Sequence, residues 1–169
     1  MDRRTKRLQL RPIRLSDLGS YLALFSRPPL VAHRPDPRPD PPAVIAAGFH
    51  EDLARWQQAG VGRWAMEADG LVIGFGGLAS RPGYAGLNIS YHLFPEFWKQ
   101  GYALEFVNEA AWVACNMIRA EQVFGLVRAA NPASRRVLEK AGFIFERVVD
   151  LGGAPSDMLI LKPLLRGNK

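Results

Sequence analysis

The segment Trp98-Lys99-Gln100-Gly101-Tyr102-Ala103-Leu104-Glu105 follows an apolar run that ends at Phe94-Pro95, and a long helical pattern begins within it. The first backbone N–H groups of a helix have no partner inside the helix, and the helix dipole adds positive potential at the same end. Gly101 and Ala103 leave room for a phosphate, and Lys99 adds a positive charge. The segment therefore predicts an anion-binding turn between a strand and a helix, with an ordinary glycine turn as the alternative.

The composition is that of one globular domain. The chain has 169 residues, of which 48% are hydrophobic and 22% charged, which suits a single core and is unlike a disordered chain. Cys115 is the only cysteine, so neither a disulfide framework nor a cysteine-based metal site is expected. His33 and His50 lack ligand partners at metal spacing, and no apolar run has the length of a membrane span. We therefore expect a cytoplasmic protein that binds neither a metal nor a membrane.

The positive charge leaves three interpretations open. A formal net charge of +6 and a pI near 9.9 suit a nucleic-acid partner, an anionic cofactor or an arginine-rich surface. Much of the excess lies near the start of the chain, at Arg3, Arg4, Lys6, Arg7, Arg11 and Arg14. We expect residues 1–7 to form a solvated basic tail. Nucleic-acid binding is not expected, because no aromatic-and-basic RNA motif or recognition-helix signature accompanies the charge.

Apolar periodicity predicts alternating strands and helices. Strands are expected near residues 8–15, 64–67, 71–78, 87–94, 123–127, 143–149 and 158–161, and helices near 18–25, 42–58, 102–118 and 132–141. Asp69-Gly70 predicts a tight hairpin turn, whereas the prolines between Pro28 and Pro42 predict a stiff loop without regular helix. A mixed sheet with helices on both faces accommodates this order.

A second segment, Asn131-Pro-Ala-Ser134-Arg-Arg-Val-Leu138-Glu-Lys140-Ala-Gly142-Phe143, predicts a short helix with Asn131 as its N-cap and Gly142 as its C-cap. Together with the first segment and the order of elements, it resembles the GNAT superfamily of acetyl-CoA-dependent N-acetyltransferases. The first segment is similar to that family's R/Q-x-x-G-x-G/A turn, except that Trp98 stands where Arg or Gln is usual. The aromatic start and the N-x-x-S-x-x-V-L-x-K-x-G-F pattern resemble the branch of ribosomal-protein N-terminal acetyltransferases.

The resemblance implies a GNAT-like α/β fold over residues 8–166, with a mixed, mostly antiparallel sheet of six to seven strands and helices on both faces. It also implies acetyl-CoA as the acyl-donor cosubstrate, with its pyrophosphate on the backbone of the turn and its pantetheine arm along the preceding strand. The cofactor-binding residues would then be Leu93, Phe94, Trp98, Lys99, Gln100, Gly101, Tyr102, Ala103, Leu104, Asn131 and Ser134.

The usual catalytic pair of the family is incomplete in this chain. Asn88 stands where relatives carry a glutamate base, and asparagine cannot accept a proton at neutral pH. Leu138 stands where other branches have a tyrosine acid. By resemblance, Ser134 is a proton donor or hydrogen-bond partner for the departing thiolate, and it forms the catalytic candidates together with Asn88.

Three routes to a neutral amine stay open: a water chain held by Asn88 and Ser90, a base from elsewhere such as Glu51 or His92, or no catalysis. Strand alternation places His92 opposite Tyr91, where packing or exposure is the simpler role.

The expected function is transfer of an acetyl group from acetyl-CoA to a primary amine, either a peptide or protein N-terminus or a small amine. A noncatalytic acyl-CoA-binding or sensing protein is the first alternative, because both usual catalytic positions are changed. A basic nucleic-acid-binding protein is the second. The acceptor and the oligomeric state, a homodimer included, stay open.

Overall fold

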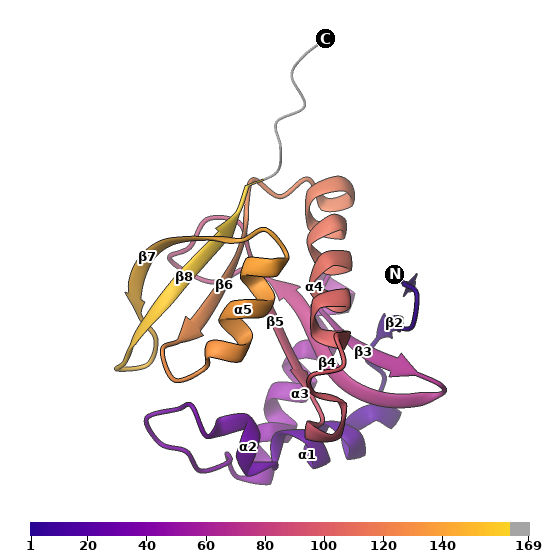
Figure 1. Cartoon of the computed structure of the whole chain (residues 1–169). Coiled ribbons are helices and arrows are strands. Elements are labelled where there is room, and N and C mark those ends of the chain that lie inside the picture. Colours follow the sequence, from indigo (N-terminus) through magenta and orange to yellow (C-terminus); the bar gives the residue numbers. More distant parts are fainter. Residues whose placement is uncertain (163–169) are drawn as a thin grey trace.

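The computed structural model describes residues 1–162, and the expected domain end at residue 166 lies outside the described residues. Within that range one sheet has helices on both faces (Figure 1). Its strands are β1 (Arg3–Arg4), β2 (Gln9–Pro12), β3 (Arg63–Ala68), β4 (Leu71–Ala79), β5 (Leu87–Leu93), β6 (Val123–Arg128), β7 (Ile144–Asp150) and β8 (Pro155–Leu161).

The strand order is β1-β2-β3-β4-β5-β6-β8-β7, and β5–β6 is the one parallel pair among the described strands. The expectation of a mixed, mostly antiparallel sheet is confirmed. The sheet has eight strands rather than six to seven, because Arg3 and Arg4 pair with Leu10 and Gln9.

Helices cover the two faces of the sheet separately. One face carries α1 (Leu18–Phe25), α2 (Pro28–Val31) and α3 (Pro42–Ala59), and the other carries α4 (Tyr102–Trp112) and α5 (Pro132–Lys140). The short turns are η1 (Leu15–Asp17), η2 (Pro95–Phe97) and the π-helical η3 (Val113–Ile118), which continues α4. Because strand side chains alternate, Ala65 packs in the α1–α3 core while Trp64 and Met66 pack against α4.

The prediction of a tight turn at Asp69-Gly70 is confirmed, and the prediction for the proline-rich loop is wrong in part. Asp69 and Gly70 have φ of 49° and 77° in the β3–β4 hairpin, and Gly60 ends α3 at φ 64°. The proline-rich segment was expected to lack helix, yet Pro28 begins the short helix α2. A proline is tolerated there because the first N–H groups of a helix have no helical acceptor.

The first seven residues are not a solvated tail. Arg3 Nε lies 2.6 Å from Glu109 Oε1, and Arg7 Nε lies 2.8 Å from Glu105 Oε2, so both arginines are tied to α4. Thr5 Oγ1 also donates to Glu105 Oε1. Acidic residues on the outer side of α4 neutralise part of the basic cluster and hold the start of the chain against the helix.

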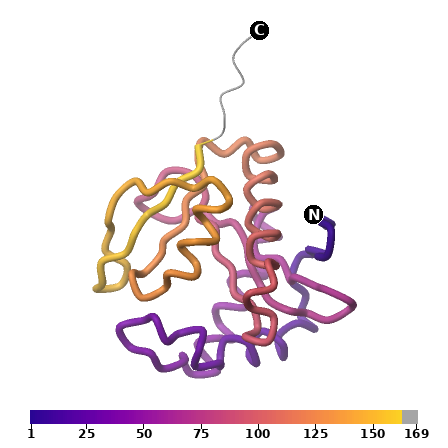
Figure 2. The backbone as a smooth tube through the Cα atoms, in the orientation of Figure 1, coloured from indigo at the N-terminus to yellow at the C-terminus, as the bar shows by residue number. Residues whose placement is uncertain are grey.

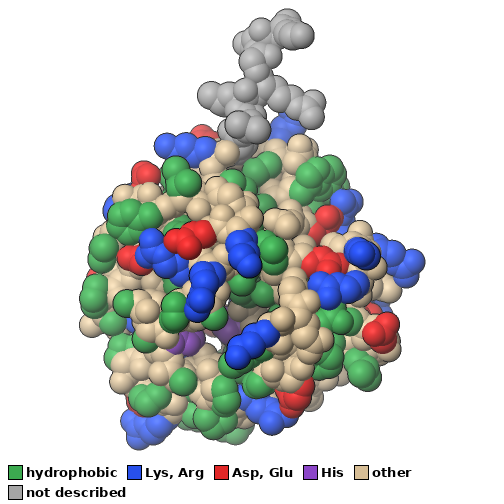
Figure 3. All heavy atoms as spheres, in the orientation of Figure 1, with side chains coloured by type: hydrophobic (Ala, Val, Ile, Leu, Met, Phe, Trp, Pro, Cys, Tyr) green, Lys and Arg blue, Asp and Glu red, His purple; other side chains and the backbone are tan. Residues whose placement is uncertain are grey.

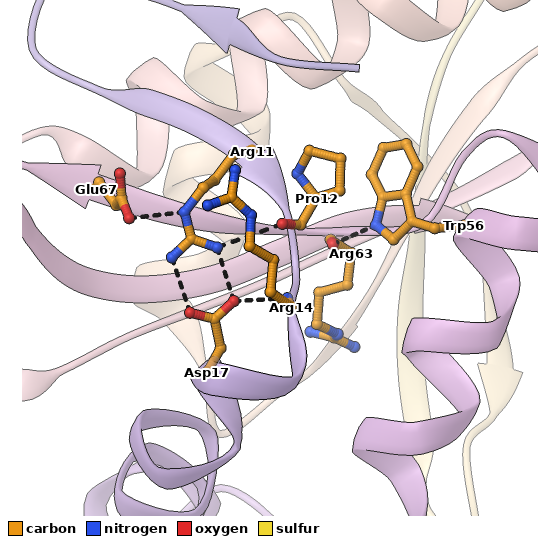
Figure 4. A network of polar contacts seen from close by, with 7 residues as sticks. All are labelled: Arg11, Pro12, Arg14, Asp17, Trp56, Arg63 and Glu67. Atoms are coloured by element: carbon orange, nitrogen blue, oxygen red, sulfur yellow. Dashed lines mark hydrogen bonds and ion pairs between the residues drawn. The ribbon is translucent and has the colours of Figure 1, made fainter.

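A buried ion network fixes the other end of β2. The guanidinium of Arg11 contacts both carboxylate oxygens of Asp17 at 2.7 and 2.8 Å, and its Nε contacts Glu67 at 2.7 Å (Figure 4). Burial acts to raise the pKa of Asp17, but hydrogen bonds from Arg11 and from the Arg14 N–H outweigh it and lower that pKa. The network joins β2 to β3 and η1.

The strands β5 and β6 diverge along their length. They pair at two positions only, Leu87 with Val123 and Asn88 with Phe124, after which β6 pairs with β8 alone. Figure 2 shows the two strands separating, with α4 and α5 on the near side. The second half of β5 therefore has one edge without a strand partner, and this gap leads to the start of α4.

Candidate functional site

The turn before α4, Trp98–Leu104, has the shape that its sequence predicts, and we call it the α4 turn. Lys99 and Gly101 have φ of 60° and 85°, and the first helical hydrogen bond runs from the Glu105 N–H to the Gly101 carbonyl at 3.1 Å. The N–H groups of residues 102–104 therefore precede the helical ladder and are available to a ligand. Their position at the helix start favours an anion.

Two side chains hold the α4 turn onto the end of β5. The indole Nε1 of Trp98 donates to the Leu93 carbonyl at 2.8 Å, and the Gln100 amide donates to the Glu96 carbonyl at 2.8 Å. Trp98 thus holds the turn to the end of β5, and the residue is still 41% exposed.

Two backbone groups at the end of β5, which were expected to be free for a ligand, are already hydrogen-bonded within the protein. The Leu93 carbonyl is taken by Trp98, and the Phe94 N–H donates to the Ile73 carbonyl at 3.0 Å. Because backbone groups alternate in direction along an antiparallel strand, Tyr91 and Leu93 direct their own N–H groups toward the β6 side. The part of β5 whose backbone N–H groups face the open edge is therefore Tyr91–Leu93, with the Leu93 carbonyl already occupied by Trp98.

Arg7, which was expected in a solvated tail, contacts the α4 turn. Its Nη1 donates to the Gln100 carbonyl at 2.8 Å, and its guanidinium lies 4.3 Å from the centre of the Tyr102 ring. A Cβ on Gly101 would stand 3.2 Å from Arg7 Nη2. Arg7 therefore clamps the outer side of the turn, and glycine leaves space for it.

A hydroxyl pair bridges the gap between β5 and α5. Tyr91 Oη lies 2.8 Å from Ser134 Oγ, while the Ser134 N–H donates to Asn131 Oδ1 at 3.2 Å. Burial raises the pKa of Tyr91 to about 12, so it is protonated at neutral pH. The Asn131 side chain is used as the N-cap of α5, as predicted. Tyr91 was not among the residues expected in the site, because no local pattern links it to Ser134.

Leu138, at the position of the family's tyrosine, packs against Gly125 of β6. It is 2% exposed, and its Cδ1 would lie 2.5 Å from a Cβ placed on Gly125. Gly125 therefore leaves the space that this aliphatic side chain of α5 occupies.

The opposite face of β5 borders a separate cavity of about 590 Å³, which we call the arginine cavity. It lies between α3 and the strands, and its polar and charged lining comprises Asp52, Arg55, Arg63, Ser80, Arg81, Asn88 and Ser90. Asn88 donates through Nδ2 to the Ile89 and Phe124 carbonyls at 3.1 Å each, which joins β5 to β6 where they part. Asn88 and Ser134 thus lie on opposite faces of β5.

Asp52, the carboxylate of the arginine cavity, is fully engaged. Its Oδ2 accepts from Arg63 Nε at 2.5 Å and from the Tyr21 hydroxyl at 3.0 Å, and its Oδ1 accepts from Arg55 at 3.3 Å. The carbonyl of Arg63 in turn accepts from the Trp56 indole, and the Arg63 side chain extends away from that ring (Figure 4). This carboxylate is an ion-pair partner and is poorly placed to act as a base.

The two other candidate bases are not brought to the same place. Glu51 is exposed and faces Arg55 at 4.0 Å. His92 packs on the Phe25 ring, with centroids 4.8 Å apart, and its Nδ1 is buried without a hydrogen-bond partner among the described residues. Burial, together with nearby Arg63, His33 and Arg34, lowers the pKa of His92 to about 3. His92 is therefore neutral and a weak base.

Figure 3 shows a hollow in the molecule on the face of α4 and α5, with histidine side chains in its depth and Lys or Arg side chains around it. Across residues 1–162, no three His, Cys, Asp or Glu side chains gather in a way that could hold a metal ion. Over the same range no helix combines the length and apolar character needed to cross a bilayer.

Comparison with known proteins places this geometry in a family. Residues 7–144 match the model of the acetyltransferase (GNAT) domain. A curated relative from Bacillus subtilis (strain 168), the uncharacterized N-acetyltransferase YoaA, is 27% identical over 150 residues, covering 86% of this chain and 84% of the relative.

Solved structures share the fold. The acetyltransferase from Agrobacterium tumefaciens strain C58 superposes with a TM-score of 0.83 at 23% identity, covering 95% of this chain and 94% of that one. RimL, a ribosomal L7/L12 alpha-N-protein acetyltransferase in complex with coenzyme A, superposes with a TM-score of 0.79 at 15% identity, covering 94% and 96%. With the family model spanning most of its length, the chain belongs to the GNAT acetyltransferase family.

Proposed function

We propose that this protein transfers an acetyl group from acetyl-CoA to a primary amine, either a peptide or protein N-terminus or a small amine. The observation that carries the proposal is the α4 turn, whose backbone N–H groups open beside the gap between β5 and β6. A helix start suits the pyrophosphate of the cosubstrate, and the free edge of β5 suits its extended arm. RimL, which shares this fold, is solved in complex with coenzyme A.

The residues present fit acetyl-CoA. The N–H groups of residues 102–104 would bind the pyrophosphate, with Lys99 and Gln100 at its side and Gly101 leaving space. Trp98 would fix the turn through Leu93, and the Leu93 N–H would polarise the thioester carbonyl. Phe94 would border the arm through its position at the end of β5, and Asn131 would act by positioning Ser134.

The reaction forms a bond between the amine nitrogen and the acetyl carbon and breaks the carbon–sulfur bond. The leaving thiolate needs a proton, which the paired hydroxyls of Ser134 and Tyr91 would supply from the α5 side of the gap. The amine must first lose its own proton. A chain of waters held by the side-chain carbonyl oxygen of Asn88 and by Ser90 would carry this proton to bulk solvent. Asp52 would not take it, because its oxygens already accept from Arg63, Tyr21 and Arg55.

A noncatalytic acyl-CoA-binding protein is the second candidate. The observation that favours it is the side chain of Asn88, which stands on β5 where relatives carry a base. Its amide donates a hydrogen bond to the Phe124 carbonyl of β6. This candidate keeps the role of the α4 turn and gives Ser134 no proton to transfer.

Calorimetric titration with acetyl-CoA, followed by thiol release with a panel of N-terminal peptides and small amines, tests the proposal. Binding followed by amine-dependent thiol release supports acetyl transfer. Binding without release by any amine favours the noncatalytic candidate, and absence of binding removes both. Ser134→Ala should retain acetyl-CoA binding and release thiol about tenfold more slowly with the same amine, which would tie the release to this site.

A further inference from the structure

The arginine cavity carries an excess of positive charge. Arg55, Arg63 and Arg81 line it, whereas Asp52 is the one carboxylate among its lining residues. The lining therefore has a formal charge of about +2 at neutral pH, because arginine is always protonated in proteins. A cavity of one sign, walled by protein, concentrates ligands of the opposite sign.

The single carboxylate does not neutralise the arginines nearest to solvent. The Asp52 side chain is 9% exposed, and its Oδ2 accepts hydrogen bonds from Arg63 and Tyr21 in the α1–α3 core. Its contact with Arg55 is longer, at 3.3 Å, and the Arg55 side chain is 47% exposed. The Arg81 guanidinium lies 5.7 Å from the Tyr84 ring, in the loop after β4. Arg55 thus reaches the cavity from α3, and Arg81 from the loop after β4.

Arg63 adds a donor that the protein leaves unsatisfied. Its Nη1 is buried and has no hydrogen-bond partner within the part of the chain that the structure describes. An unpaired buried guanidinium N–H is costly, and an anionic ligand that enters the cavity would lower this cost.

The cavity is also joined to the proposed reaction path. Asn88 and Ser90 line it, and they lie on the same strand as Tyr91, whose hydroxyl faces the proposed cosubstrate side. An acceptor that binds against α3 would therefore place its amine at β5 while the rest of it contacts the arginines.

Resting on the function proposed above, we propose that the acceptor carries a carboxylate or comparable anion near its amine, and that Arg55 and Arg81 bind this anion. The acceptor class is an acidic peptide N-terminus or a small amino acid-like amine. Polyamines and other polycations are disfavoured, because their charges would face three arginines.

Peptides that differ in one charge test this inference. The tetrapeptide amides Ala-Glu-Ala-Ala, Ala-Gln-Ala-Ala and Ala-Lys-Ala-Ala, with β-alanine, β-alanine amide and spermidine, serve as acceptors in a thiol-release assay. We expect kcat/KM for the Glu peptide or for β-alanine to exceed that of the matched amide by about tenfold or more, as for a charge-assisted hydrogen bond. Arg55→Gln and Arg81→Gln should bring this ratio close to one without changing acetyl-CoA affinity.

Arg147→Gln is the matched control, because it removes the same charge from β7 at the far edge of the sheet and should keep the ratio. Equal kcat/KM for the charged and amide acceptors, or a preference for the Lys peptide or spermidine, would overturn the inference while the proposed function stands. If no acceptor releases thiol, calorimetry with the N-acetylated Glu and Gln peptides in the presence of CoA measures whether the carboxylate tightens peptide binding. Tighter binding of the acetylated Glu peptide then supports the anion site alone, and equal binding overturns it.

Discussion

The two faces of β5 carry positive potential from different sources. On the α4 side, positive potential comes from backbone N–H groups at a helix start, supplied by one short segment, Trp98–Leu104. On the α3 side, it comes from arginine side chains that lie far apart in the sequence, Arg55, Arg63 and Arg81. Backbone donors are present whatever the local side chains, whereas each arginine is needed separately.

This difference determines how each face responds to substitution. A side-chain substitution can block the α4 turn, but it cannot remove the backbone N–H donors. A bulky acidic residue in the turn should therefore weaken anion binding far more than removal of the Lys99 side chain. The arginine cavity loses a specific contact with each charge removed. Its ion pairs also hold α3 to β3, so its residues affect folding as well as binding.

Gly101→Glu should have the largest effect, on the α4 side alone. The residue has φ of 85°, and a side chain there would meet Arg7 and bring negative charge to the anion site. We expect acetyl-CoA affinity to fall by about 1000-fold or more, measured by calorimetry, because steric and electrostatic losses combine.

Gly153→Glu is the matched control for Gly101→Glu. Gly153 has φ of 79° and lies in the β7–β8 turn, where a Cβ would have no other atom within 4 Å. The substitution carries the same backbone strain and the same charge change, so the affinity of this variant for acetyl-CoA should equal that of the parent. A folded Gly101→Glu protein with parental affinity would contradict the assignment of the α4 turn.

Asp52→Ala should have the next largest effect, on the stability of the α3 side. It leaves Arg63 and the Tyr21 hydroxyl without their acceptor in a buried setting, for which we expect a loss of about 3 kcal/mol in the free energy of unfolding. Urea denaturation measures this loss, and Asp36→Ala, which breaks an exposed pair with Arg38, should leave the midpoint unchanged. Acetyl-CoA affinity of the folded variant should match the parent, and a parallel fall would mean that the two faces are coupled.

The α4 side was predictable because its determinants are local. Gly101 at a strand-to-helix turn and Asn131 as the cap of α5 each act within a few residues, so the sequence order reveals them. The structure adds the parting of β5 from β6 after Asn88.

The α3 side was not predictable, because its contacts join distant residues. Asp52, Arg63 and Tyr21 share no spacing that marks them as one network. The same limit holds for one contact on the α4 side, where Tyr91 meets Ser134 across 43 positions. The role of Arg7 was missed for the same reason. A basic cluster near the start of a chain resembles a solvated tail, and only the fold places Glu105 beside Arg7. Charge and periodicity predict elements, whereas pairing across the sheet depends on the completed fold.

Acidification should destabilise the α3 side through His92. Burial, with Arg63, His33 and Arg34 nearby, lowers the pKa of His92 from 6.5 to about 3. Between these two pH values the imidazole is protonated in the unfolded chain and neutral in the folded protein. Stability is then full above pH 6.5 and falls as the pH decreases toward 3. By pH 5 we expect a loss of about 2 kcal/mol in the free energy of unfolding from this group. Urea denaturation between pH 7 and pH 5 measures it, and His92→Gln should flatten the slope, apart from the share of His33, whose pKa burial also lowers. An unchanged slope in His92→Gln would contradict the prediction.

Tyr91→Phe should have the smallest effect, and it sharpens the comparison because Tyr91 belongs to β5 yet acts on the α4 side. It removes the hydroxyl that contacts Ser134 Oγ at 2.8 Å, for which we expect a loss of about 1 kcal/mol in stability. If the two hydroxyls protonate the thiolate as a pair, Tyr91→Phe and Ser134→Ala should each lower kcat by about tenfold, with little change in KM for acetyl-CoA. The double variant should then be little slower than either single one, because each substitution already breaks the pair. Multiplying effects in the double variant would show that the hydroxyls act independently, and a parental kcat in Tyr91→Phe would leave Ser134 as the donor without help from β5.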